Sequence, residues 1–158
     1  MANYTDTLGF YKGSAGFGAH ADKRVGYVSV KLDFAKIVAA RLAASATALA
    51  AGDTLQVLQI PAGALMLAGG LTVSEAELTN TTATFDLGCT GGSPIAANAF
   101  VNDGASNALA NLSTGLAAPQ LFATADTIDL LLNTAVPANA VVWAWAWYLN
   151  ADAAESAN

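Results

Sequence analysis

The segment that most constrains this chain is a short apolar run enclosed by turn residues. Residues 54–60 (Thr-Leu-Gln-Val-Leu-Gln-Ile) follow Gly52-Asp53 and precede Pro61-Ala62-Gly63. Gly and Asp favour the entering turn, and a proline has no N–H for a strand ladder, so a strand here has to end before the proline or lie at an edge. The segment predicts a β-strand, and residues after Gly63 have the pattern of further strands separated by turns.

Alternation of apolar and polar residues predicts further half-buried strands. The ranges with this alternation are Gly26–Phe34, Leu71–Ala76, Ala83–Leu87, Asp126–Asn133 and Val141–Leu149. Ala64–Leu67 is separated from Leu71–Ala76 by Gly69-Gly70. The strands at 71–76 and 83–87 are expected to pair as a hairpin or meander.

Three segments depart from this alternation. Phe34–Ala44 has apolar residues spaced by four and predicts a short amphipathic helix capped by Asp33, with alanines up to Ala51 adding helix propensity. Asn102-Asp103-Gly104 predicts a turn, and Asn107–Pro119 predicts a long surface excursion. Short strands, frequent turns and one minor helix together predict an all-β fold, a jelly-roll-like antiparallel β-sandwich.

We divide the chain into an N-terminal arm (1–25), a jelly-roll body (26–150) and a polar C-terminal tail (151–158). The arm has too many glycines for a regular element and too many aromatic residues for a solvated tail. An extended arm that docks its rings on a partner fits both facts, and a frayed terminus is the alternative. The arm residues predicted to bind a partner are Phe10, Tyr11, Lys12, Phe17, Lys23 and Arg24.

Charge is scarce and unevenly distributed. Only 11% of residues are charged and 54% are hydrophobic, so much of the surface is expected to face other protein. All six basic residues lie within residues 1–41, and residues 42–158 contain nine acidic ones. The basic front either reflects drift in composition or lies against an acidic body, its own or a neighbour's.

The same numbers exclude several classes of protein. The net charge of −6 argues against a nucleic-acid partner, and the apolar runs are too short or too interrupted to cross a membrane. Nothing at the start resembles a signal peptide, so we expect a protein made and used, or assembled, inside a cell. The single cysteine, Cys89, excludes an internal disulfide framework and is expected to be a buried apolar residue, with a reactive thiol as the alternative.

The last strand carries the strongest aromatic pattern. Trp143, Trp145 and Trp147 share one face, and Ala144, Ala146 and Tyr148 share the other. Alternate residues lie roughly 6.6 Å apart, so the indoles form a ladder. We interpret Trp143, Trp145, Trp147 and Tyr148 as core or subunit-interface residues, and a carbohydrate-binding ladder is the alternative.

Catalytic chemistry is not indicated. The single histidine, His20, lies in the arm with nothing to position it, and no paired His or Cys supplies a metal site. Glu75 and Glu77 share a strand parity that a glycosidase could use, but an exposed acidic strand end is the favoured interpretation. Asp126 and Asp129 are expected on opposite strand faces. We predict a protein that is not an enzyme and has no cofactor and no metal.

Several segments resemble small structural proteins of tailed bacteriophages. They are Tyr27–Phe34, Ala35-Lys36-Ile37, the run Ala51–Gly63, Leu71-Thr72-Val73, Thr84–Gly88 and the aromatic strand Trp143–Leu149. In that group such chains are similar to capsid cement or decoration proteins, several of them from cyanophages, and the resemblance covers roughly residues 25–150. The 107–119 excursion and the three-tryptophan strand are not matched.

The resemblance implies a jelly-roll homotrimer that binds the major capsid protein on the outside of the phage head, where capsomers meet, after assembly in the bacterial cytoplasm. It does not identify an outward ligand. The competing hypothesis is a receptor- or glycan-binding module of a phage tail or fibre, which requires an exposed tryptophan ladder or an exposed 107–119 loop.

Overall fold

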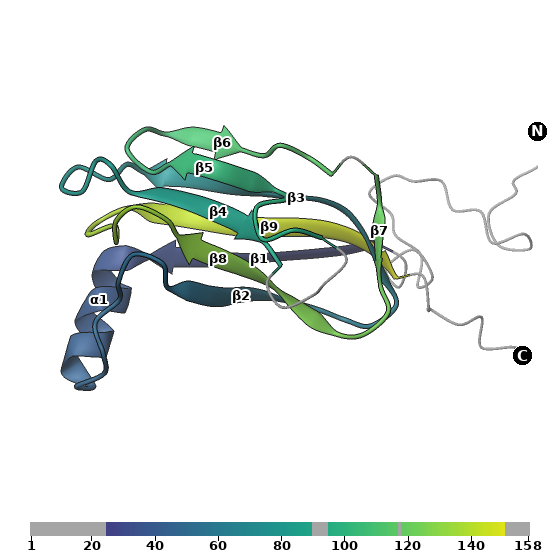
Figure 1. The fold of residues 1–158 in the computed structure, drawn as a ribbon, viewed down its shortest axis with the longest axis horizontal. Coiled ribbons are helices and arrows are strands. Elements are labelled where there is room, and N and C mark those ends of the chain that lie inside the picture. Colours follow the sequence, from purple (N-terminus) through teal and green to yellow (C-terminus); the bar gives the residue numbers. More distant parts are fainter. Residues whose placement is uncertain (1–24, 90–94, 117, 151–158) are drawn as a thin grey trace, which may run out of the picture.

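The computed structural model describes residues 25–89, 95–116 and 118–150. They form two antiparallel sheets packed face to face, with one helix at one end (Figure 1). The elements are β1 (Val25–Asp33), α1 (Phe34–Ala43), β2 (Thr54–Ile60), β3 (Ala64–Glu75), β4 (Thr84–Gly88), β5 (Val101–Ala105), β6 (Ala110–Leu112), β7 (Gln120–Phe122), β8 (Asp126–Leu132) and β9 (Val141–Asn150). The predicted β-sandwich with one short helix is confirmed.

The strand order is jelly-roll-like. Sheet A has the order β1-β9-β3-β6, with β7 also paired to β3, and sheet B has the order β2-β8-β4-β5. The pairs are nested, because β6 pairs with β3, β8 with β2 and β9 with β1. A long antiparallel ribbon folded over on itself gives this nesting, and the chain crosses between the sheets repeatedly as it runs from β1 to β4.

The core lies between the two sheets. Alternate residues of β8 point inward, and Ile128, Leu130 and Leu132 are all completely buried, as the alternation predicts. Across the core, β9 contributes the small residues Ala144 and Ala146, which are also completely buried. Small inner side chains on a central strand leave room for larger ones from other elements. Phe85 and Phe100 fill that room in the same buried core.

The pair Gly69-Gly70 does not interrupt a strand, because β3 runs through it from Ala64 to Glu75. A Cβ at Gly69 would lie 2.9 Å from the ring of Phe100 in the core. A Cβ at Gly70 would lie 2.6 Å from the Leu112 carbonyl oxygen and 2.7 Å from the Trp145 indole. These glycines therefore admit close packing on both faces of the strand.

The predicted pairing of residues 71–76 with 83–87 is wrong. β3 belongs to sheet A and β4 to sheet B, and the connection between them crosses the end of the sandwich. Polar turn residues are equally compatible with a hairpin and with a crossing between sheets, so the local sequence could not separate the two.

The turn predicted at Asn102-Asp103-Gly104 is also wrong, since these residues lie within β5. Asp103 has a φ of 50°, and its N–H donates to Asp86 Oδ1 at 2.7 Å. The pairing of β5 with β4 shifts register at this point. Residues that favour a turn here form an irregularity in a strand instead. The expected 107–119 excursion likewise contains a strand, β6, which pairs with β3.

The helix agrees with the prediction for Phe34–Ala44 to within one residue, since it runs from Phe34 to Ala43. Asp33 is the N-cap, and its Oδ1 accepts the Lys36 N–H at 3.2 Å. The alanines that continue to Ala51 do not extend the helix. The Arg41 guanidinium donates to the Thr47 carbonyl oxygen, so a local contact after the helix outweighs the helix propensity of alanine.

A buried carboxylate holds together two loops at the end of the sandwich that carries α1. Glu77 is completely buried in the β3–β4 loop. Its Oε1 accepts the N–H groups of Thr79 and Asn80, both at 2.8 Å. In the β8–β9 loop, three consecutive residues donate their N–H groups to Oε2 at 2.7–3.2 Å, namely Ala138, Asn139 and Ala140. Five backbone donors therefore share one carboxylate.

Replacing Glu77 by Gln should lower the free energy of unfolding by about 3 kcal/mol, because a neutral amide cannot accept from donors on both sides of a buried carboxylate. Denaturant unfolding measures the change. Glu75→Gln is the matched control, since Glu75 is exposed two residues earlier. Equal stability of the two variants would show that the Glu77 network does not hold the loops.

The network also predicts an acid dependence. Burial raises the pKa of Glu77, but the N–H groups of Asn139, Asn80, Thr79 and Ala138 outweigh burial and lower the pKa from 4.5 to about 2. The stabilisation is fully present above about pH 4.5 and is lost as the pH falls through about 2, because the unfolded chain binds the proton first. The stability difference between the native chain and Glu77→Gln should shrink over this range in unfolding curves recorded at several pH values.

Candidate functional site

The outer surface of sheet A is aromatic. In the β1–β9 pairing, Tyr27 lies opposite Trp147 and Lys31 lies opposite Trp143. The ring centroids of Tyr27 and Trp147 are 4.8 Å apart, so the two rings are in contact. We call the outward side chains of Tyr27, Trp143, Trp145 and Trp147 the aromatic face.

The aromatic face is exposed in the single chain. Trp143, Trp147 and Tyr27 are 41%, 44% and 53% exposed. Trp145 is less exposed because its indole lies over Gly70, where no side chain blocks it. The prediction that the tryptophans belong to the core is therefore wrong for the isolated chain, since the alanines on the opposite side of β9 fill the core. The subunit-interface prediction stays open.

The exposed aromatic area is comparable to the largest apolar patch on a typical monomeric protein, and such a patch is often functional. An aromatic side chain presents about 150–250 Å² when extended, so Tyr27, Trp143 and Trp147 leave on the order of 300 Å² in solvent. Val25 and Leu121, 43% and 51% exposed, lie on the flanking strands β1 and β7. Apolar patches of this size mark binding surfaces more often than scattered exposed residues do.

Polar groups border the aromatic face. Thr72 lies opposite Trp143 on β3, and its Oγ1 hydrogen-bonds to Asn111 Oδ1 of β6 at 2.8 Å. Lys31 is the cation on this surface, and the other two cations of the described residues, Lys36 and Arg41, lie on α1. Lys36 forms an ion pair with Asp33 at 3.0 Å, and its hydrogen bonds lower the pKa of Asp33.

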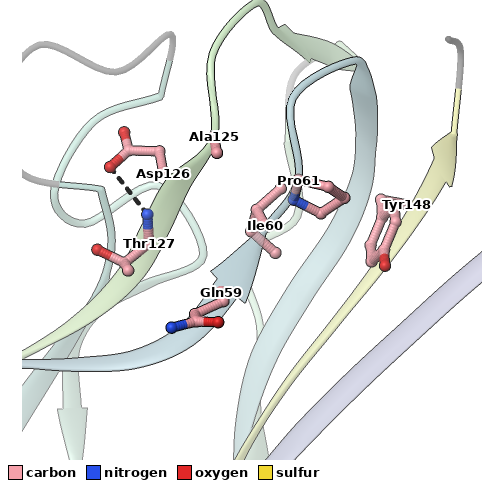
Figure 2. A pocket seen from close by; sticks show the side chains of 7 residues that line it. All are labelled: Gln59, Ile60, Pro61, Ala125, Asp126, Thr127 and Tyr148. Atoms are coloured by element: carbon pink, nitrogen blue, oxygen red, sulfur yellow. Dashed lines mark hydrogen bonds between the residues drawn. The ribbon is translucent and has the colours of Figure 1, made fainter.

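A separate open pocket of about 630 Å³ is shown in Figure 2. It lies where β2 ends and β8 begins, near the opposite end of the sandwich from α1 (Figure 1). It is lined by Gln59, Ile60, Pro61, Ala125, Asp126, Thr127 and Tyr148. Tyr148 points away from the tryptophans, and its ring packs where a Gly26 side chain would lie. Tyr148, predicted to be a core or subunit-interface residue, is partly buried against the core and also forms a pocket wall.

Among the described residues the candidate catalytic side chains do not assemble into an active site, and His20 lies outside those residues. Glu77 is not the exposed strand end considered from the sequence, and its carboxylate is fully engaged by backbone donors, so it cannot serve as a glycosidase acid. Cys89 is buried, as expected. Within the described ranges no group of three metal-ligating side chains occurs, and no helix has the length and apolar character to span a bilayer.

Part of the predicted site lies outside the described residues. This applies to all six arm residues: Phe10, Tyr11, Lys12, Phe17, Lys23 and Arg24. Conversely, Tyr27 and Gly70 contribute to the aromatic surface without having been predicted from the sequence. Tyr27 shares its strand parity with Ser29 and Lys31, which marks it as outward-facing, but only the β1–β9 register places it against Trp147. The sequence around Gly70 does not indicate that this residue leaves room for the Trp145 indole.

No protein-family model matches the chain, and no curated protein sequence is similar to it. Solved structures with a similar fold include a chain from the cyanophage Pam1 capsid asymmetric unit (TM-score 0.52, 18% identity, 94% of this chain and 99% of that chain). A chain from the capsid of Ralstonia phage GP4 has a TM-score of 0.54 and 13% identity, over 80% of this chain and 84% of that one. A chain from the acidic stable capsid of Helicobacter pylori bacteriophage KHP30 has a TM-score of 0.53 and 12% identity, over 81% and 89%. At these identities the likeness shows a shared fold.

The exposures predict how each tryptophan responds to a quencher. In dilute samples in which the chain is monomeric, variants retaining only Trp143 or only Trp147 should show red-shifted emission and efficient acrylamide quenching. A variant retaining only Trp145 should be quenched less, because its indole is covered by the strand. Equal, weak quenching of all three in a monomer would contradict the outward orientation of the aromatic face.

Proposed function

We propose that this chain is a virion structural protein, a capsid decoration or cement protein that binds the outside of a phage head as a homotrimer. The arm contacts the major capsid protein, and the aromatic face forms the centre of the subunit interface. The protein stabilises contacts between neighbouring capsomers and performs no catalysis. It is located at the surface of the head after assembly in the host cytoplasm.

The aromatic face is the observation that carries this proposal. Interface centres are enriched in Trp and Tyr and depleted of charge, and this surface has Tyr27, Trp143, Trp145 and Trp147 with Lys31 as its charge. An interface of standard size buries about 800 Å² on each partner, so an apolar centre on the order of 300 Å² with a polar rim is of suitable size. The fold shared with chains from phage capsid structures adds support.

A closed ring suits such a surface. Identical subunits related by a threefold axis cover each other's apolar faces without leaving an open end. An arm that grips the shell then adds a second, tethered contact to each docked body, which raises overall affinity without a new interface. The low charge content of the chain, 11%, is consistent with a surface that is largely covered by protein.

A glycan- or receptor-binding role in a tail or fibre is the second candidate, and the exposure of Trp143 and Trp147 favours it. Planar indoles on an open sheet can stack on sugar rings, and Thr72 and Asn111 lie beside them as hydrogen-bonding groups. The two functions differ in what covers the tryptophans. A decoration protein hides them between subunits, and a glycan-binding module leaves them exposed in the assembled oligomer.

The copy number of the chain in purified virions, relative to the major capsid protein, tests the proposal directly. A decoration protein should be present in hundreds of copies in a fixed ratio to the shell protein. A few copies per virion would instead indicate a location in the tail or at a vertex. Absence of the chain from particles would exclude both viral roles. Deleting residues 1–24, which keeps β1 intact, should abolish capsid binding and leave a folded oligomer.

Replacing Trp143 and Trp147 together by Ser tests the interface. Central interface residues contribute about 2 kcal/mol each, so the dissociation constant of the oligomer should rise roughly a thousandfold. Analytical ultracentrifugation measures it. Leu109→Ser is the control, since Leu109 is 71% exposed and lies between β5 and β6. An unchanged oligomer in the double variant would remove the aromatic face from the interface.

A further inference from the structure

The pocket at the end opposite α1 combines apolar, anionic and hydrogen-bonding groups. Pro61 and Tyr148 contribute ring surfaces, Asp126 a carboxylate, and Gln59 an exposed amide near the end of β2 (Figure 2). Asp126 Oδ1 accepts the Thr127 N–H at 2.8 Å, and Oδ2 accepts no hydrogen bond from the described residues. The pocket therefore suits a ligand with an aromatic ring beside a cation.

One segment of this chain has that chemistry. Phe10-Tyr11-Lys12 lies in the arm between Gly9 and Gly13 and places two aromatic side chains directly before a lysine. The cations of the described residues have other positions, because Lys31 lies on the aromatic face and the other two lie on α1. Lys12 is thus a basic residue of the front half of the sequence whose chemistry complements the carboxylate of Asp126.

The chain enters the body beside this pocket. Gly26, the second residue of β1, packs against the ring of Tyr148, which forms one wall. Lys12 is thirteen residues before Val25, and a chain of that length spans at most about 45 Å. That reach exceeds the length of β9, roughly 33 Å for ten residues, so the segment is long enough to extend beyond the sandwich to which it is attached.

We propose that the pocket binds Phe10-Tyr11-Lys12 of a second copy of this chain, so that neighbouring subunits exchange their arms. The inference rests on the proposed homotrimer, in which symmetry gives every arm an equivalent pocket on the next subunit. The ring surfaces of Pro61 and Tyr148 receive the aromatic residues, and Asp126 pairs with Lys12. Each exchanged arm tethers two subunits that already meet through the aromatic face, and the arm residues outside Phe10-Tyr11-Lys12 are the ones that contact the shell.

Disulfide trapping in the full-length chain tests the exchange. Tyr11→Cys combined with Gln59→Cys should form dimers and trimers linked by disulfides under mild oxidation, read on a non-reducing gel. Cys89 is buried and stays in place. Tyr11→Cys with Gln56→Cys is the matched control, because Gln56 is exposed on the same strand but does not line the pocket. Cross-links within single chains only, no cross-link, or equal cross-linking in the control would each overturn the proposal.

Charge reversal provides a second test without cysteines. Lys12→Asp and Asp126→Lys should each weaken the oligomer about tenfold, since each places like charges together. Mixing the two variants should restore assembly in part, because two of the three arms in a mixed trimer then meet an opposite charge on the next chain and one arm still meets a like charge. A mixture as weak as the single variants would contradict exchange between copies.

Failure of this inference is distinguishable from failure of the proposed function. Capsid binding and copy number are measured on particles, whereas trapping and mixing use the purified chain alone. A chain that binds capsids as a trimer but gives no Tyr11–Gln59 cross-link refutes arm exchange only. A chain that cross-links as expected but is absent from virions keeps the exchange and loses the decoration role.

Discussion

The packing of this protein depends on β9, which carries small buried side chains on one face and large exposed side chains on the other. Val142, Ala144 and Ala146 face inward and are completely buried, while Trp143 and Trp147 face outward and are more than 40% exposed. Because β9 lies between β1 and β3, its small inner side chains set how closely the sheets approach. The large outer side chains make the surface of sheet A apolar.

The end of the sandwich that carries α1 depends on a different kind of interaction. Glu77 collects five backbone N–H groups from two loops that are separated by about sixty residues in sequence. A buried carboxylate is tolerated only when its oxygens are satisfied, and here the loops themselves supply the donors. The side chain that looks most like a catalytic acid in the sequence therefore holds the fold.

The two candidate binding surfaces differ in their chemistry. The aromatic face is open and carries mainly aromatic side chains, whereas the pocket near Tyr148 is concave and includes the carboxylate of Asp126. Both are formed partly by β9, since Trp147 and Tyr148 are neighbours on that strand and successive residues of a strand face opposite sides.

Local patterns are enough to predict the strands at 54–60 and 126–133, the Asp33 cap and the alternation of β9, because each depends on local periodicity or a local hydrogen bond. The side of β9 that faces the core could not be predicted in this way, since alternation separates two faces without saying which one is covered. The tertiary structure was also needed to assign β4 to sheet B, to place Asp103 within a strand and to show that Glu77 is buried. In each case the deciding partner, such as Asp86 for Asp103 or Ala138 for Glu77, is distant in sequence.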